Sequence, residues 1–435
     1  MSATATSLDV VRELRAICGE EYVVEVTDKP ANIHEDPNRE IAARFFEHSF
    51  LVATPASTEE VSAILRLANE RSVGIFPVGG RTNCYPPPRN STHVVLSTSR
   101  LTEVEHYDPA DLTVGVGAGM TLTRLNEIVG ADQLMFAADP PYPERATVGG
   151  LLATASHGPM RHGYGGVRDF CIGIRFVTGD GRRAKGGGRV VKNVAGYDLM
   201  KLLIGSYGTL AVITSASFKL FPAPRQTKTF LAEFASAAEA LKFRDLILHS
   251  PLSPMCLELV SPGARKLMRP EMTSDAWVIC VRAAGSYAVL ARYRKELGSA
   301  VTRELEGEKE NLLWRKIEDC GLWDCIDVTV PTSEVAGVLG ALDDAVSKGV
   351  AEYAALGRIG LGHVRVVTDI GNFGGPSPTT TLISCLRDRF QKKISLTVVT
   401  RGVNPWPITA PHPASMRAVK QALDPNNVLR GREIF

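Results

Sequence analysis

Two adjacent glycines stand in the segment PVGGRTN, Pro77 to Asn83, directly after a short apolar run. Glycine tolerates positive φ, and successive N–H groups can then point into one concavity that suits a phosphate. We therefore expect at least one positive φ at Gly79 or Gly80. The alternative is an ordinary turn at the end of a strand, and the motif alone does not separate the two.

A second glycine-rich segment, ATVGGLLATASHGPMRHGYGGVRDF, runs from Ala146 to Phe170. Small residues fill the space between its glycines, and it holds too few large apolar residues to form a core of its own. Such a surface lets a flat or extended ligand approach the backbone closely. A long glycine-rich loop inside a compact domain is usually functional or disordered.

Other patterns in the chain are weaker signals. The run from Gly115 to Gly119 is similar to a dinucleotide fingerprint, but Met120 stands where the third glycine belongs. The chain has no Gly-Lys-Ser/Thr, which excludes a P-loop. His157 and His162 lie five residues apart in a glycine-rich loop, a spacing that suits no common metal motif. We predict no metal site.

Hydrophobic periodicity indicates the elements that must position these segments. Ser57-Thr58-Glu59-Glu60 is typical of a helix start. Apolar residues that alternate up to Phe176, followed by Gly179-Asp180-Gly181, indicate a hairpin. Further strands are expected at 73–76, 94–96, 113–118 and 216–220, and a second helix from Thr121.

A proline pair at Pro222 and Pro224 indicates a domain boundary, because the glycine-rich loops thin out after it. Helical and strand patterns then alternate, with a helix expected from Ala237 to Leu248. This alternation favours an antiparallel sheet with helices. We expect one domain over 1–224 (core about 47–224), a second over 225–400, and a C-terminal segment, 401–435, that returns to the first.

Bulk properties exclude several classes of protein. The net charge of +2 provides no basic field for nucleic acid. The eight cysteines are dispersed without a C-x-x-C, which is typical of a reducing compartment and offers no cluster or zinc spacing. The N-terminus lacks the features of a signal peptide, and no apolar run reaches membrane-spanning length. We expect a cytoplasmic protein, with peripheral attachment through a partner as the alternative.

The two glycine-rich segments and a third one, VVKNVAGYDLMKLLIGSYGTLAVI, together resemble a known family. In this order they are similar to the flavin-binding domain of the vanillyl-alcohol oxidase/p-cresol methylhydroxylase (PCMH) family. The phrase KNVAGYDL…GSYGTL resembles FAD-linked oxidases of the glycolate oxidase group, most of all the FAD-binding E subunit. The resemblance implies an α+β fold, with a two-lobed FAD-binding domain and an α+β cap domain that contains an antiparallel sheet.

The resemblance also implies which residues bind FAD. The first two loops would hold the pyrophosphate from two sides, residues 158–166 would run beside the cofactor, and 205–213 would meet the ribityl or isoalloxazine region. Lys192 to Asp198 would order the approach to that turn. The implied FAD-binding residues are Pro77, Val78, Gly79, Gly80, Arg81, Thr82, Asn83, Thr147, Val148, Gly149, Gly150, Thr154, Gly158, Gly165, Gly208, Val212 and Ile213.

The chain departs from the family at three points. Some relatives attach FAD covalently, through a histidine in the first loop or a cysteine in the second. Here Asn83 stands in the first loop, and no cysteine precedes Cys171 in the second. The histidine-rich metal and substrate stretch of the catalytic D-type subunit is missing. Arg430-Gly431 replaces the usual Asn-Pro-Gly near the C-terminus, which puts the last contact near the flavin in question.

The resemblance implies a FAD-dependent oxidoreductase component for a small 2-hydroxy acid such as glycolate or lactate, in which flavin N5 accepts a hydride. His363, Arg365 and Arg401 are the candidate substrate-side groups, because arginine can clamp a carboxylate and histidine can act as a base. The alternative for these three is a structural or surface role. The alternative for the chain is a FAD-carrying electron-relay or architectural subunit that works with flavin and iron–sulfur partner subunits.

Because neither loop offers an attachment residue, FAD should be noncovalent. Acid denaturation of the purified yellow protein should therefore release the flavin into the supernatant, as measured by absorbance after centrifugation. Flavin that stays with the precipitate would show that the two loops have been misinterpreted.

Overall fold

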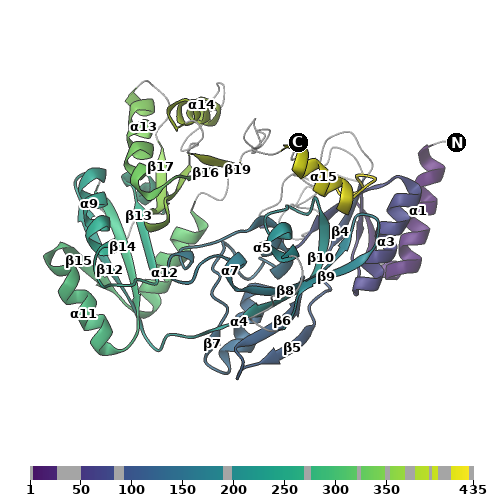
Figure 1. Ribbon diagram of the computed structural model, residues 1–435, viewed down its shortest axis with the longest axis horizontal. Helices are drawn as coiled ribbons and strands as arrows, with labels where there is room; N and C mark the ends of the chain where they lie inside the picture. The colour runs from purple at the N-terminus through teal and green to yellow at the C-terminus, as the bar shows by residue number, and fades with distance from the viewer. Residues whose placement is uncertain are drawn as a thin grey trace. The chain divides into compact units, whose positions relative to one another are not determined.

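The computed structural model describes residues 3–26, 50–82, 93–189, 198–268, 276–320, 325–347, 353–367, 378–390, 394–399 and 413–430. The chain divides into two compact units (Figure 1). Unit 1 comprises Met1–His157, Gly166–Ala223 and Pro411–Phe435, and unit 2 comprises Gly158–Gly165 and Pro224–Ala410. The chain therefore leaves unit 1 twice and returns to it twice.

The first sheet of unit 1 has four strands in the order β1-β2-β4-β3. They are β1 (Val23–Val26), β2 (Phe50–Ala53), β4 (His93–Ser97) and β3 (Gly74–Val78), and β2, β4 and β3 are parallel. Helices α1 (Ala3–Cys18) and α3 (Thr58–Arg71) contribute Leu14 and Leu65 to the core beside this sheet. The start of α3 is fixed as expected, because the Ser57 side chain accepts from the N–H of Glu60 and the Glu60 carboxylate accepts from the N–H of Ala56.

The second sheet of unit 1 is antiparallel, in the order β5-β6-β10-β8-β9. Its strands are β5 (Val104–Asp108), β6 (Thr113–Gly117), β10 (Ala211–Lys219), β8 (Cys171–Thr178) and β9 (Arg183–Gly187). Alternate residues of the three central strands face a core shared with α4 (Leu122–Gly130) and α5 (Val148–Thr154). A small pair, β7 (Leu134–Met135) and β11 (Phe221–Pro222), and the short helices α7 (Val167–Phe170) and α8 (Leu199–Leu203) complete this half.

Unit 2 is built on an eight-stranded sheet in the order β15-β12-β14-β13-β17-β18-β16-β19, in which every recorded pairing is antiparallel. Its strands are β12 (Thr227–Phe234), β13 (Cys256–Val260), β14 (Trp277–Ala284), β15 (Val301–Leu305), β16 (Cys325–Thr329), β17 (Ala354–Arg358), β18 (His363–Val367) and β19 (Ser395–Val399). The antiparallel sheet confirms the expectation for the second half of the chain.

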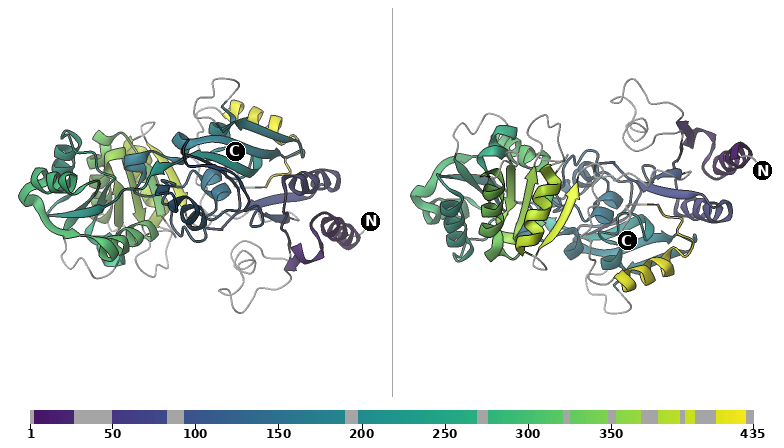
Figure 2. Two further views of the ribbon diagram at one scale, coloured as in Figure 1. Left: turned by 90° about the horizontal axis from the view of Figure 1, so that it is seen from below. Right: turned by 90° about the horizontal axis from the view of Figure 1, so that it is seen from above.

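Helices cover both faces of this sheet (Figure 2). Because side chains alternate along a strand, Ile279 and Val281 of β14 face one core, and Val278 and Cys280 face the other. The first core is closed by α9 (Ala237–Leu248), α11 (Tyr287–Leu297), α13 (Val335–Ser347) and α14 (Pro378–Phe390), and the second by α10 (Pro262–Met268) and α12 (Gly307–Asp319). Helix α9 has the predicted bounds, with Ser236 as its cap.

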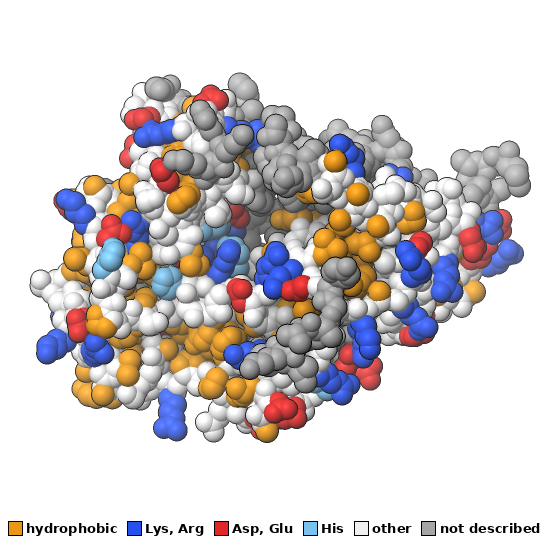
Figure 3. Space-filling model, viewed as in Figure 1, with side chains coloured by type: hydrophobic (Ala, Val, Ile, Leu, Met, Phe, Trp, Pro, Cys, Tyr) orange, Lys and Arg blue, Asp and Glu red, His pale blue; other side chains and the backbone are white. Residues whose placement is uncertain are grey.

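On the face drawn in Figure 3, Lys and Arg side chains are interspersed with Asp and Glu side chains. Among the described residues, no helix combines the length and the apolar character that a membrane crossing needs.

Glu310 anchors α12 to the sheet of unit 2. Its side chain is buried, and its carboxylate accepts from the hydroxyls of Thr227 and Thr229 at 2.7 and 2.8 Å and from Arg282 Nε at 3.2 Å. The Trp314 indole donates to Thr229 at 2.8 Å. A buried carboxylate with this many donors is stabilised only while all of them remain in place.

We predict that Glu310→Ala destabilises unit 2 by about 3 kcal/mol, because the change removes the partner of a partly buried arginine and of two hydroxyls. Glu308→Ala, on the exposed side of the same helix, should stay within about 0.5 kcal/mol of the parent. Urea unfolding followed by tryptophan fluorescence measures this, because all four tryptophans lie in the part of the chain that forms unit 2. Equal effects of the two substitutions would contradict the prediction.

Candidate nucleotide-binding site

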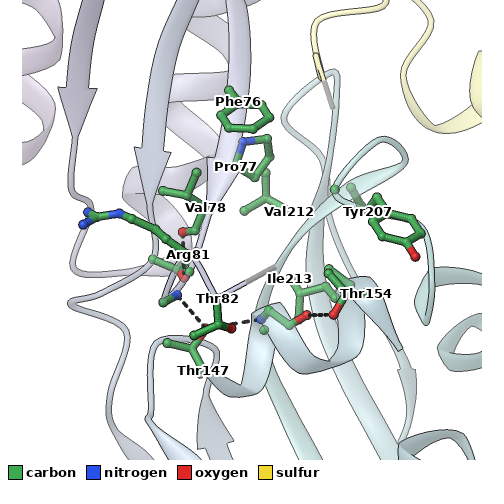
Figure 4. A pocket seen from close by; sticks show the side chains of 18 residues that line it. Phe76, Pro77, Val78, Arg81, Thr82, Thr147, Thr154, Tyr207, Val212 and Ile213 are labelled. Carbon is green, nitrogen blue, oxygen red and sulfur yellow. Dashed lines mark hydrogen bonds between the residues drawn. The ribbon is translucent and has the colours of Figure 1, made fainter. Parts of the chain in front are cut away.

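A pocket in unit 1 lies where the end of β3, helix α5 and the start of β10 meet (Figure 4). At one end Phe76, Pro77 and Val212 come together, and Thr82 and Thr147 lie at the other. The pocket is lined by Phe76, Pro77, Val78, Gly79, Gly80, Arg81, Thr82, Thr98, Thr147, Gly149, Gly150, Ala153, Thr154, Tyr207, Gly208, Ala211, Val212 and Ile213. One end is thus apolar, and the other carries hydroxyls and glycine backbone.

Most of the predicted FAD-binding residues lie together in this lining, although they come from three distant segments. Four do not. Val148 is fully buried beneath it, and Gly158 and Gly165 belong to unit 2. Asn83 and Arg401 lie outside the described residues, as does the predicted approach from Lys192 to Asp198 except for Asp198 itself.

The first loop approaches the second more closely than any side chain would permit. A Cβ on Gly80 would overlap the carbonyl oxygen of Arg145 and lie 2.5 Å from its carbonyl carbon. A Cβ on Gly79 would overlap the hydroxyl of Thr147. Gly80 therefore requires glycine because the contact is with backbone, and a larger residue at Gly79 would displace the Thr147 hydroxyl.

The expected positive φ at Gly79 or Gly80 is wrong. The left-handed residue of this loop is Arg81, with φ 64°. The two glycines keep negative φ and are needed for the close approach, so the turn of the chain falls one residue later than expected. Glycine both permits a positive φ and avoids a clash at Cβ, and the sequence alone does not show which of these two properties a position needs.

The backbone N–H groups at the start of α5 are mostly occupied. Val148 N donates to Met120 O at 2.9 Å, and Gly149 N donates to Ala118 O at 2.7 Å. The Thr147 hydroxyl accepts from the N–H groups of Gly80 and Gly150, both at 3.3 Å. In this conformation the second loop supplies a phosphate with hydroxyls and few free N–H groups.

A second cavity, of about 650 Å³, adjoins the pocket and shares Gly79, Gly80, Arg81 and Thr147 with it. Its described lining contains three arginines, several hydroxyls and no carboxylate. The lining residues are Thr54, Gly79, Gly80, Arg81, Ser97, Ser99, Thr102, Gly119, Met120, Thr121, Arg124, Arg145 and Thr147. Guanidinium groups among hydroxyls and glycine backbone are the surroundings that a pyrophosphate requires.

Several lining residues carried no clear signal in the sequence. Phe76, Ala153 and Ala211 are ordinary residues of strands and a helix, and Thr98 directly follows β4. Tyr207 had a signal that went unused: it stands inside the GSYGT turn, where its φ is 53° and that of Gly208 is 72°. A bulky residue at positive φ is uncommon and often marks a functional turn.

In unit 2, the candidate substrate clamp Arg365 is already engaged. It donates from Nε and from a terminal nitrogen to the two oxygens of Asp327, at 2.8 and 3.0 Å. Burial alone would raise the pKa of Asp327, but Arg365 and the hydrogen bonds outweigh burial and hold this pKa below its usual range. The pairing uses the planar donors that would clamp a carboxylate substrate.

The candidate base His363 is enclosed as well. Its Nδ1 lies 3.2 Å from a terminal nitrogen of Arg358, and because arginine can only donate, Nδ1 accepts and Nε2 carries the proton. That proton faces Asp327, with Nε2 3.5 Å from Oδ1. Burial lowers the pKa of His363 to about 3, so the ring is neutral near pH 7. These contacts favour the structural alternative for His363.

Arg358 is the residue of this cluster that sequence reasoning missed. Its Nε donates to the carbonyl of Gly158 at 2.9 Å, and Glu258 lies 3.4 Å from the same nitrogen. Gly163 N also donates to Met255 O at 3.1 Å. The segment 158–165, predicted to run beside the cofactor, is therefore held by unit 2. No group of three or more His, Cys, Asp or Glu side chains within the described ranges is arranged to hold a metal.

The residues of unit 1 fit a dinucleotide. The pocket offers an apolar end, a side-chain-poor wall and hydroxyls, and the adjoining cavity offers guanidinium groups. A Cβ at Gly79 or Gly80 would collide with the facing segment at the junction of the two. A dinucleotide is flat at its ends and doubly charged in the middle. A flat end would suit the apolar end of the pocket, and the charged middle would suit the hydroxyls and guanidinium groups. The lining thus has the features that a site for a dinucleotide cofactor needs.

The cofactor class is given by comparison with known proteins. Residues 50–187 match the family model described as the FAD binding domain. The D-lactate dehydrogenase of Archaeoglobus fulgidus is 36% identical over 262 residues, 59% of this chain and 57% of that protein. Glycolate oxidase subunit GlcD of Bacillus subtilis is 28% identical over 420 residues, 88% of each chain. The match to the first of these relatives thus spans little more than half of its length.

Solved structures support the fold. The structure of p-cresol methylhydroxylase with substrate bound superimposes with a TM-score of 0.75 at 17% identity, and the match covers 99% of this chain and 97% of that one. The expected PCMH-type fold is confirmed. The particular resemblance to the E subunit stays a prediction.

We predict that Gly80→Val abolishes retention of FAD. The new side chain meets backbone, which cannot rotate away, and overpacking of this kind costs about 3 kcal/mol, or about a hundredfold in affinity. The variant should purify colourless, and the absorbance at 450 nm per mole of protein measures the loss.

The control for this experiment is Gly130→Ala in α4, where a Cβ meets nothing within 4 Å. Gly117, in the weaker glycine pattern from Gly115 to Gly119, is not suitable as a control, because a Cβ there would lie 2.6 Å from the carbonyl carbon of Leu101. Full flavin occupancy in Gly80→Val would show that the contact between the two loops does not support the site.

Proposed function

We propose that the protein is a FAD-dependent oxidoreductase component that acts on a small 2-hydroxy acid such as glycolate or lactate. The single observation that carries this proposal is the dinucleotide pocket assembled from three distant segments within the FAD binding domain. The names of the relatives, a D-lactate dehydrogenase and a glycolate oxidase subunit, support the substrate class.

Oxidation of a 2-hydroxy acid to a 2-oxo acid removes the α-hydrogen as a hydride and the hydroxyl hydrogen as a proton. FAD, when bound, supplies the hydride acceptor at its N5. Residues of unit 1 would bind and orient the noncovalent cofactor: Arg81, Arg124 and Arg145 supply positive charge for the pyrophosphate, and Phe76 and Val212 exclude water from the apolar end.

A second candidate function is supported by the cluster in unit 2. Arg365 and His363 have their polar groups engaged with Asp327 and Arg358, so neither presents a free carboxylate clamp or base. A chain that carries FAD without its own substrate site would be an electron-relay or architectural subunit. Its partners would be a catalytic flavin subunit and an iron–sulfur subunit. The name of one relative, a glycolate oxidase subunit, supports a complex of several chains.

Anaerobic mixing of the purified yellow protein with glycolate or D-lactate should bleach the flavin, because the cofactor gains two electrons. The absorbance at 450 nm in a stopped-flow instrument measures this. Oxidised absorbance that persists with a panel of 2-hydroxy acids would reject the first function. Bleaching that appears only after the partner subunits are added would support the second.

A further inference from the structure

The C-terminal segment, residues 413–430, folds back onto unit 1 as helix α15 (Pro413–Leu423) and a short extended stretch. Ile75 N donates to Val428 O at 2.8 Å, and Arg430 N donates to Ile75 O at 2.7 Å. This pairing covers the open edge of β3 directly before Phe76, where the strand begins to line the pocket. Val428 and Leu429 are buried in the core with Val212 of β10.

Lys420 of α15 connects this segment to the opposite wall of the pocket. Its ammonium donates to Thr209 O at 2.7 Å, to Leu429 O at 3.1 Å and to Asp424 Oδ2 at 2.5 Å. An ammonium group has three protons, so these three acceptors satisfy it completely. Only 17% of the Lys420 side chain is exposed.

Asp424 completes the network. Its two oxygens accept from the N–H groups of Val428 and Leu429, each at 2.8 Å, and its side chain is fully buried. A Cβ on Gly179 would lie 2.6 Å from the Cβ of Asp424, so the hairpin between β8 and β9 packs directly on it. The carboxylate therefore has one available position.

The carbonyl that Lys420 holds belongs to a strained turn. Thr209 follows Tyr207 and Gly208, whose φ values are both positive and which both line the pocket. Tyr207 N donates to Ala153 O at 2.7 Å, and Thr209 N donates to Ser206 O at 3.0 Å. A backbone of this shape persists only where its surroundings hold it.

We propose that Lys420, supported by Asp424, is a positioning residue of the FAD site: it fixes the Tyr207–Ile213 wall against the β3 wall without touching the cofactor. The inference rests on the proposed function, because it assumes that FAD occupies this pocket. Replacing a buried ion pair by apolar residues is often neutral or stabilising, whereas directional bonds to one carbonyl fix a geometry.

The test compares Lys420→Met with the parent protein by titration of FAD into apoprotein, followed by flavin fluorescence. We expect the dissociation constant for FAD to rise about tenfold or more, because the wall loses its anchor. Amide hydrogen exchange of residues 207–213 should rise more than exchange in β5 of the same unit. Asp424→Asn, which keeps the side-chain shape, should also raise the dissociation constant for FAD. This variant replaces Lys420→Met in the test if Lys420→Met does not fold.

The matched control is Leu14→Ala in α1, which removes a buried side chain from the core that also contains Val428 and Leu429. It should lower the melting temperature of the apoprotein and leave the FAD dissociation constant within about twofold of the parent. If Lys420→Met and Asp424→Asn behave like this control, the positioning role is rejected. If the parent protein itself does not bind FAD, the proposed function fails, and hydrogen exchange of residues 207–213 alone then decides whether Lys420 holds the wall.

Discussion

The site in unit 1 depends on one steric constraint, which is the absence of a Cβ where two loops cross. Gly80 lies against the carbonyl of Arg145, and Gly149 lies so close to Ala118 that a Cβ would be 2.9 Å from the alanine Cβ. These contacts are made by backbone or by rigid alanine, so a rotamer change could not relieve a larger residue. Because one loop follows β3 and the other leads into α5, the same constraint holds two sheets together and places their small residues around the pocket.

Charge is used differently in the two units. In unit 2, Arg365 is paired with Asp327, and Arg358 lies between His363, Glu258 and the carbonyl of Gly158, so the charged groups there are internally matched. A network of this kind is rigid and holds its segments in one arrangement. In unit 1, three arginines line one cavity that has no carboxylate in its described lining. Charge pairs between strands suit a scaffold, and guanidinium groups gathered around one cavity suit an anionic ligand, so the distribution of charge supports ligand chemistry in unit 1 more than substrate chemistry in unit 2.

The sequence was informative about local features and uninformative about contacts across long separations. The pattern of residues from Ala237 to Leu248 was sufficient for the bounds of α9. Gly79 and Gly80 were predicted to bend the chain around a phosphate, but their close contacts are with Thr147 and Arg145, which no local pattern encodes. The engagement of Arg365 by Asp327 depends likewise on the register of β16 against β18. Local propensity predicts elements, whereas the role of a side chain depends on which partner the topology brings to it.

The topology explains why the two ends of unit 1 matter to one site. Its core is shared by Leu14 near the beginning of the chain and by Leu429 near the end, and all of unit 2 is inserted between them. Contacts of such large sequence separation can form only after the loop that they close has been made, so they are costly in entropy. The strand edge of β3 and the carbonyl of Thr209 are satisfied only by the last described residues. The pocket wall is therefore complete only when the C-terminal segment has returned, and a chain cut at the domain boundary would expose both groups.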